Sequence, residues 1–303
     1  MKKIFILFVS LTLLTNTNAQ DSSVISTQSS TSAQSTVKVD ADVSSNEKPV
    51  NKYPYKTSFK KDAPVIAVGL GLTALGVTLI QKKDTLTSAE LATKTRDKVP
   101  FFDRGNVGYY SDKINDASYL PFHASFAMPI VLLLLNKNER RNASHILVMY
   151  LESLSITGAL FTISAGSIHR SRPLVYTNSA GTSEASLRER RKSNNQRSFF
   201  AGHTAASATG TFFAAKVFSD LNPNSALKPV IWGVAAAVPA VVGYMRYKSG
   251  HHFLSDNLLG YIVGAASGIL IPEWHKSGGH KDISFFPQIG KDYKGFSFVY
   301  NMK

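Results

Sequence analysis

The sequence predicts an all-α protein: a helical bundle of about six core helices, embedded in a membrane, with a short C-terminal tail that resembles a β-hairpin. The first observation is that apolar segments of helical length recur along the chain, separated by polar stretches. The second is that these segments are rich in small residues, which let helices approach closely in a bilayer. The segments are residues 63–80, 119–135, 146–168, 200–218, 227–244 and 253–271.

The chain begins with the features of an export signal. Two lysines follow the first methionine, and the apolar run 4–14 is shorter than an ordinary membrane span. Small residues then lead up to Ala19, so residues 1–19 are predicted to be a signal peptide that is cleaved after Ala19. Residues 20–55 are rich in Ser and Thr with few large apolar side chains, which predicts a disordered tether.

Residues 56–275 are predicted to form one helical domain. The segment 146–168 is long enough to cross a bilayer, which favours a membrane bundle. Mean hydropathy is only −0.05, however, and Glu152 interrupts that segment. A soluble helical bundle, whose helices turn an apolar face to the core, is therefore the alternative.

The last part of the chain, residues 276–303, changes character. Residues 284–286 and 296–300 have the composition of strands, and Gly290 and Gly295 flank a plausible turn. A hairpin is predicted here, without a functional assignment.

Three short stretches carry the chemistry. They are His169-Arg170-Ser171-Arg172-Pro173, the stretch from Ser198 to His203, and Arg246 followed by His252 and Asp256. A phosphoryl group in transfer carries negative charge on its oxygens, so its catalysis rests on positioning and charge stabilisation. Arginine is suited to this task because its planar fork binds two oxygens and keeps its charge, which makes Arg172 and Arg246 candidates.

The histidines supply candidate reacting groups. His252 and Asp256 are four residues apart, a spacing that places both on one helix face. Asp256 is expected to accept a hydrogen bond from His252, leaving the other ring nitrogen free to attack phosphorus. His203 is the candidate general acid, and Gly202 before it lets backbone N–H groups approach an anion. His251 is a rival nucleophile, although its spacing of five to the aspartate is less favourable.

Together these stretches resemble the type 2 phosphatidic acid phosphatase superfamily, which also contains the vanadium haloperoxidases. The resemblance covers roughly residues 60–272, and its most specific part is the third stretch. It implies a phosphohistidine intermediate on His252, with Asp256 as orienting group and His203 as proton donor to the leaving group. It further implies phosphate binding by Arg172, Arg246 and the Gly202 backbone, and a mechanism that requires no metal or other cofactor.

Three positions depart from the superfamily pattern. Ala165 stands where the first motif normally has a lysine, and Arg170 is the candidate to supply the missing charge. Ala201 and Met245 each stand where a serine is usual. Because the residues that make and break bonds remain, the departures predict altered affinity or selectivity.

The predicted function is hydrolysis of a phosphate monoester or pyrophosphate of a lipid or isoprenoid carrier in a bacterial envelope. The alternatives are a soluble broad-specificity acid phosphatase, a vanadate-dependent haloperoxidase and a non-catalytic lipid-binding protein. The net charge of +14 favours anionic partners, but the basic residues form no stripe typical of nucleic-acid binding. The basic residues of 188–197 are either a solvated loop or an electrostatic funnel.

The side of the membrane on which the motifs lie depends on how many segments cross it. With a cleaved signal, six full spans would place the motifs on the cytoplasmic side, and the basic loop 136–142 outside. Five full spans, or a start that never crosses the membrane, would reverse this. The predicted location is the inner membrane, with the motifs facing the periplasm.

Overall fold

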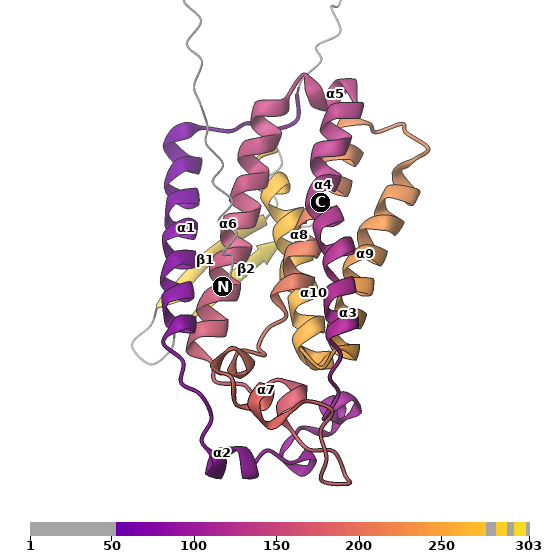
Figure 1. The fold of residues 1–303 in the computed structure, drawn as a ribbon. Coiled ribbons are helices and arrows are strands. Elements are labelled where there is room, and N and C mark those ends of the chain that lie inside the picture. Colours follow the sequence, from indigo (N-terminus) through magenta and orange to yellow (C-terminus); the bar gives the residue numbers. More distant parts are fainter. Residues whose placement is uncertain (1–52, 277–282, 290–293, 301–303) are drawn as a thin grey trace, which may run out of the picture. The chain divides into compact units, whose positions relative to one another are not determined.

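The structure, a computed structural model, describes residues 53–276, 283–289 and 294–300. The predicted signal peptide and nearly all of the predicted tether lie outside the described residues. Six long helices dominate the described part of the chain (Figure 1). They are α1 (Phe59–Gln81), α4 (Tyr119–Leu135), α6 (Ala143–Ser167), α8 (Gly202–Leu221), α9 (Lys228–Lys248) and α10 (Leu254–Trp274). The predicted all-α bundle is confirmed.

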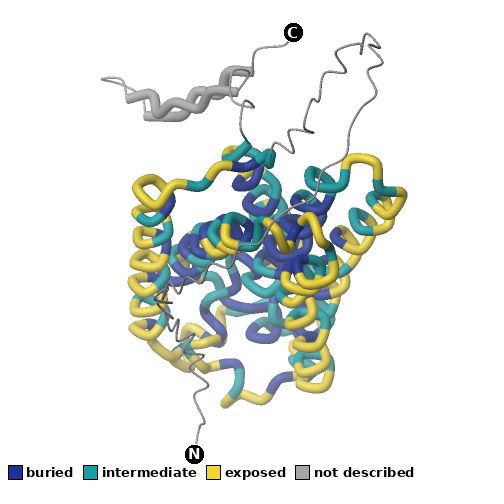
Figure 2. Tube along the Cα trace, turned by 90° about the horizontal axis from the view of Figure 1, so that it is seen from above, coloured by how far each residue is buried: buried dark blue, intermediate teal, exposed yellow. Residues whose placement is uncertain are grey.

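Five helical segments are long and apolar enough to cross a membrane, which supports a membrane protein. They are Phe59–Gln81, Asp112–Leu135, Ala143–Ser167, Lys228–Lys248 and Leu254–Trp274. Large apolar side chains such as Val68, Leu134 and Ile262 are exposed on these helices. Exposed turns face outward and buried residues gather toward the middle of the bundle (Figure 2). Such apolar outer faces fit contact with lipid, because a soluble protein rarely exposes large continuous apolar patches.

Helix α8 is the centre of the bundle. Thirteen of its 20 residues are buried, many of them Ser, Thr or Ala. Its polar side chains find partners on neighbouring helices: Thr209 Oγ1 lies 2.8 Å from Thr157 Oγ1, and Thr211 Oγ1 donates to the Ala235 carbonyl at 2.9 Å. These hydrogen bonds allow a comparatively polar helix to be enclosed by apolar ones.

Glycines bring α10 against α8. A Cβ atom added at Gly264 would lie 2.0 Å from the Ala205 carbonyl oxygen, and one at Gly268 would lie 2.6 Å from that of Thr209. Both separations are far below van der Waals contact. The close approach of these helices therefore requires glycine, and it fixes the start of α10 beside the start of α8.

Short elements cover one end of the bundle. They are α2 (Ser88–Ala92), η1 (Arg96–Lys98), η2 (Phe101–Asn106), α3 (Asp112–Ala117), η3 (Pro173–Val175), α7 (Leu187–Arg191) and η4 (Ser193–Gln196). Figure 1 shows α2 and α7 below the long helices, whereas α5 (Lys137–Arg140) lies at the opposite end. The motif-bearing loops emerge at the end covered by the short elements.

The C-terminal tail contains the two predicted strands. Strand β1 (Ile283–Ile289) pairs antiparallel with β2 (Lys294–Tyr300), in a register that runs from Ile283↔Tyr300 to Ile289↔Lys294.

Candidate phosphate-binding site

Four helix ends bring the predicted residues together. Arg172 follows the C-terminal end of α6, and His203 lies in the first turn of α8. Arg246 is in the last turn of α9, while His252 and Asp256 stand just before and just inside the start of α10. Because α8 and α10 start where α6 and α9 end, all three motifs meet at one end of the bundle.

Three arginines form a group, here called the arginine cluster: Arg172 and Arg246, which are buried, and Arg197, which is partly buried. Arg172 is 6% exposed and Arg246 is 2% exposed. Burial, followed by the charges of Arg197 and Arg246, lowers the pKa of Arg172 well below its usual value. The three cations therefore repel one another in a site where little water screens them.

The arginine cluster has unused hydrogen-bonding capacity. Among the described residues, none of its three guanidinium groups makes a salt bridge, and each has a buried Nε with no hydrogen-bond partner. The bonds they do make go to neutral groups: Arg172 donates to Asn195 Oδ1 at 3.2 Å, and Arg246 donates to Asn115 Oδ1 at 2.5 Å. An anion with several oxygens would satisfy both the charge and the free donors.

His252 is placed to act as a nucleophile. Its side chain is buried, and Nδ1 lies 2.7 Å from the backbone oxygen of Ser198. With Nδ1–H donating to that carbonyl, Nε2 of the neutral ring carries the free lone pair. Burial, then the charges of Arg172 and Arg246, lowers the pKa of His252 well below 6.5, so the ring is neutral at pH 7.

The expected direct hydrogen bond between His252 and Asp256 is not formed among the described residues, which corrects the prediction. Asp256 Oδ2 instead accepts from Ser198 Oγ at 2.6 Å and from the Phe253 backbone N–H at 3.0 Å. The physical reason is that α10 begins at Leu254, so His252 lies outside the helix and the one-face rule does not apply. Asp256 acts as an N-terminal capping carboxylate, and it reaches His252 only through Ser198.

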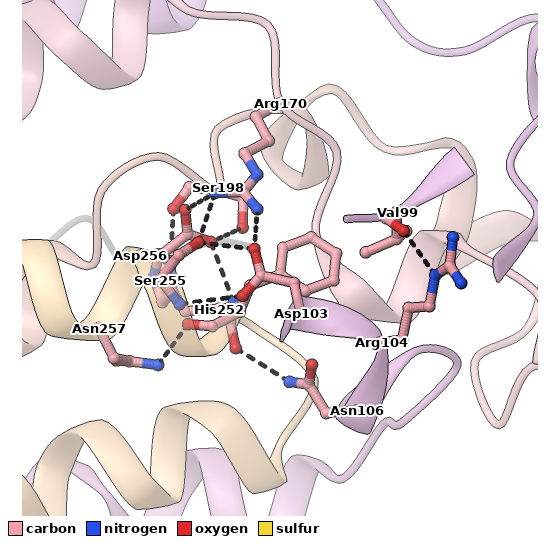
Figure 3. Close-up of polar contacts among 11 residues, drawn as sticks. Val99, Asp103, Arg104, Asn106, Arg170, Ser198, His252, Ser255, Asp256 and Asn257 are labelled. Atoms are coloured by element: carbon pink, nitrogen blue, oxygen red, sulfur yellow. Dashed lines mark hydrogen bonds and ion pairs between the residues drawn. The ribbon is translucent and has the colours of Figure 1, made fainter. Parts of the chain in front are cut away.

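Arg170 is bound to carboxylates. Its Nη2 lies 2.5 Å from Asp103 Oδ2, its Nη1 pairs with Asp256 Oδ1, and its guanidinium lies over the Phe253 ring (Figure 3). Both carboxylates are fully buried, and among the described residues Arg170 is the cation that pairs with each of them. Arg170 therefore binds Asp256 in the first turn of α10 and stabilises the start of that helix.

His203 and Gly202 open α8 beside aromatic side chains. The His203 ring lies 4.4 Å from that of Phe122 and 5.3 Å from that of Tyr119, measured between centroids. A Cβ atom at Gly202 would lie 2.6 Å from the Phe161 ring, so glycine is needed here for packing as well as for approach of an anion.

The rival nucleophile His251 has its Nδ1 3.0 Å from Ser249 Oγ and 3.1 Å from the Ser249 carbonyl oxygen. Burial and the charges of Arg172 and Arg246 lower the pKa of His251 to about 2. Its ring is therefore neutral too, and neutrality alone does not separate it from His252.

Sequence patterns missed several residues of this site. Asp103 holds Arg170 and also accepts from the backbone N–H and hydroxyl of Ser255, at 3.0 and 2.6 Å. Asn106 Nδ2 donates to the His252 carbonyl at 3.0 Å (Figure 3). Both belong to η2, far in sequence from every motif, so no spacing signal pointed to them. Arg197 directly precedes the second motif but was grouped with the basic loop.

One group in the described part of the chain has the composition of a metal site: Asp62, Glu152 and His275, whose ligand atoms lie within 4.8 Å of one another. His275 Nε2 is 3.5 Å from Asp62 Oδ1 and 3.3 Å from Glu152 Oε2. His275 caps the C-terminal end of α10, and at 1.5 Å per residue its 21 residues separate this group from His252 by about 30 Å.

A family profile supports the resemblance. A family profile described as the PAP2 superfamily matches residues 146–278, a range that contains all three motifs. One solved structure that aligns is a transmembrane PAP2-type phosphatidylglycerolphosphate phosphatase from Bacillus subtilis, at 18% identity and a TM-score of 0.42. That alignment covers 71% of this chain and 94% of the other. No curated protein matches the sequence.

Proposed function

We propose that the protein is a membrane phosphatase of the PAP2 superfamily that hydrolyses a phosphate monoester or pyrophosphate of a lipid or lipid carrier; the match of residues 146–278 to that superfamily's profile supports this. The observation that carries the proposal is the pair of buried arginines, Arg172 and Arg246, beside a neutral imidazole. Arg172 and Arg246 make no salt bridge among the described residues and each has a free Nε donor, which suits a phosphoryl group, and His252 supplies a nucleophile beside them.

The reaction follows from the positions of these groups. Arg172 and Arg246 bind the non-bridging phosphate oxygens, and Nε2 of His252 attacks phosphorus as the ester P–O bond breaks. The charge of the bound phosphate offsets the nearby arginines and favours protonation of His203, which gives its proton to the leaving oxygen. Neutral His203 then takes a proton from water, which attacks the phosphohistidine, releases phosphate and restores His252.

An apolar groove between α9 and α10 supports a lipid substrate over a soluble ester. It has a volume of about 450 Å³ and an almost wholly apolar lining. Among its lining residues are Pro239, Ala240, Gly243, Leu254, Leu258 and Tyr261. Thr204 and Asn257, which also line it, directly follow His203 and Asp256 in the chain. The groove therefore starts beside the phosphate site and offers room for a hydrocarbon chain.

The test is phosphate release from phosphatidic acid, phosphatidylglycerol phosphate, an isoprenoid pyrophosphate and p-nitrophenyl phosphate. The purified protein should hydrolyse at least one lipid, and His252→Ala should abolish the activity. Ala240→Phe, which fills the groove, should reduce lipid hydrolysis much more than hydrolysis of the soluble ester. Val234→Phe, on an exposed position of α9 outside the groove, is the matched control.

Hydrolysis of the soluble ester alone, unaffected by Ala240→Phe, would contradict the lipid assignment. An absence of any phosphate release across the panel would contradict the phosphatase itself.

We also propose that the site faces the periplasm from the inner membrane. The predicted export signal and the basic turn containing Lys137, Arg140 and Arg141, which lies at the end remote from the motifs, support this orientation. The chain has no cysteine, so single cysteines can report sidedness. In intact cells, a membrane-impermeant maleimide should label Arg188→Cys and spare Lys137→Cys; the reverse pattern would overturn the orientation.

A further inference from the structure

Arg197 occupies a position that neither the motifs nor the family match assigns to a function. It precedes Ser198, and its backbone pairs with that of Arg170 in a parallel bridge, supported by Ser198 N–H donating to the Arg170 carbonyl at 2.8 Å. This pairing joins the first and second motif loops. Arg197 thereby lies at the junction of the two motif loops, although it belongs to neither motif.

The Arg197 charge acts directly on the predicted phosphate ligands. Its charge is the largest influence, after burial, in lowering the pKa of Arg172. Burial lowers the pKa of Arg197 as well, as expected for a cation withdrawn from water without a carboxylate. Its Nε is buried and has no hydrogen-bond partner among the described residues.

Among the described residues, neither Ala165 nor Arg170 supplies a free cation in place of the superfamily lysine. Ala165, which stands at the position of that lysine, is fully buried and uncharged. Arg170, the first candidate to replace it, is held by Asp103 and Asp256. We therefore propose that Arg197 is the third phosphate-binding cation of this site and replaces the lysine absent at position 165, an inference that rests on the proposed phosphatase function.

A second cation fixes the loop that carries Arg197. Lys83, just beyond α1, is 6% exposed, and its ammonium donates to the Ile168 carbonyl at 2.7 Å and to the Gln196 carbonyl at 3.0 Å. These bonds tie the end of α6 to the residue before Arg197. Lys83 is thus a positioning residue, because both of its observed bonds go to backbone carbonyls.

Replacement of lysine by arginine changes what the site can bind. A guanidinium offers a planar pair of donors where an ammonium offers a point charge, so three arginines form a more directional set of donors around phosphate. Arg197→Gln should weaken binding of inorganic phosphate and of vanadate about tenfold to a hundredfold. Arg197→Lys should retain part of the affinity that Arg197→Gln loses, because lysine keeps the positive charge but lacks the planar pair of guanidinium donors.

The experiment measures phosphate and vanadate affinity by calorimetry on the full chain in detergent, together with kcat/KM on the best substrate. Arg188→Gln, an exposed arginine in the same loop, is the matched control and should bind as wild type does. A circular dichroism melt shows whether Arg197→Gln is folded. Wild-type affinity in folded Arg197→Gln, with loss of binding in Arg172→Gln, would overturn the inference.

The two proposals fail in different ways. If the wild type binds phosphate through Arg197 but hydrolyses no ester, the assignment of Arg197 stands and the phosphatase fails. If the wild type hydrolyses an ester and Arg197→Gln does so with unchanged kcat/KM and unchanged affinity, the phosphatase stands and the role of Arg197 is wrong.

Discussion

His252 meets Ser198 at a single short contact: Nδ1 of the imidazole lies 2.7 Å from the Ser198 backbone oxygen. The hydroxyl of the same serine donates to Asp256 at 2.6 Å. Ser198 therefore connects the candidate nucleophile to a carboxylate that does not touch it. The tautomer of His252 is set by a backbone group, and the carboxylate controls the position of that backbone.

This arrangement predicts a graded effect of substitution. Ser198→Ala keeps the backbone carbonyl but loses the bond to Asp256, so kcat should fall about ten- to a hundredfold as the imidazole loses its alignment. His252→Ala should lose all turnover. Ser153→Ala, which removes a buried hydroxyl bonded within α6, is the control and should retain wild-type kcat. A Ser198→Ala enzyme with unchanged kcat would show that the serine link is unimportant.

The pH dependence of catalysis should report the charges around His252. Burial and the neighbouring arginines lower the pKa of His252, so the ring stays neutral and nucleophilic well below pH 6.5. Removal of one cation stabilises the imidazolium, raises that pKa and moves the acid limb of kcat/KM to higher pH.

The measurement compares pH profiles of kcat/KM for wild type, Arg172→Gln and the exposed control Arg188→Gln. The limb of Arg172→Gln should lie at higher pH even though its overall rate is lower, and the control should match the wild type. If the acid limb of the Arg172→Gln profile moves to lower pH or stays in place, the ionisation that produces this limb does not belong to His252.

Much of the fold was predictable because helix formation and lipid exposure depend on local composition. The segment 119–135 coincides with α4, and the remaining five segments differ from the observed helices by a few residues at their ends. The meeting of Arg172, His203, Arg246 and His252 at one end also followed from counting helices. Each long helix carries the chain to the opposite end of the bundle, so two successive helices bring it back to the end at which it started.

The fine structure of the site depends on loop conformations that no local pattern encodes. The four-residue spacing predicts a bond from His252 to Asp256 only where both residues are helical, whereas the helix begins two residues after the histidine. Arg197 resembled its neighbours in a basic loop, and only the pairing of its backbone with Arg170 brings it inside. Asp103 comes from a short 3-10 helix far from the motifs.

Arg170 should matter for stability. Its replacement by Ala leaves the buried carboxylates of Asp103 and Asp256 without their cation, which should cost roughly 3–5 kcal/mol. The unfolding temperature of Arg170→Ala in detergent should fall by many degrees, while Arg188→Ala on the surface should melt as wild type does. Adding Asp103→Asn to Arg170→Ala should restore part of the loss. A wild-type melting temperature for Arg170→Ala would mean that these ion pairs contribute nothing.

The central claim is that the imidazole of His252 takes the phosphoryl group. Rapid acid-free quenching of turnover with ³²P-labelled substrate, followed by peptide mapping, tests it most directly. The account predicts label on the His252 peptide that survives base and is lost in acid, present in His251→Ala and absent in His252→Ala. Label on His251 or any other residue, or label that persists in His252→Ala, would contradict it.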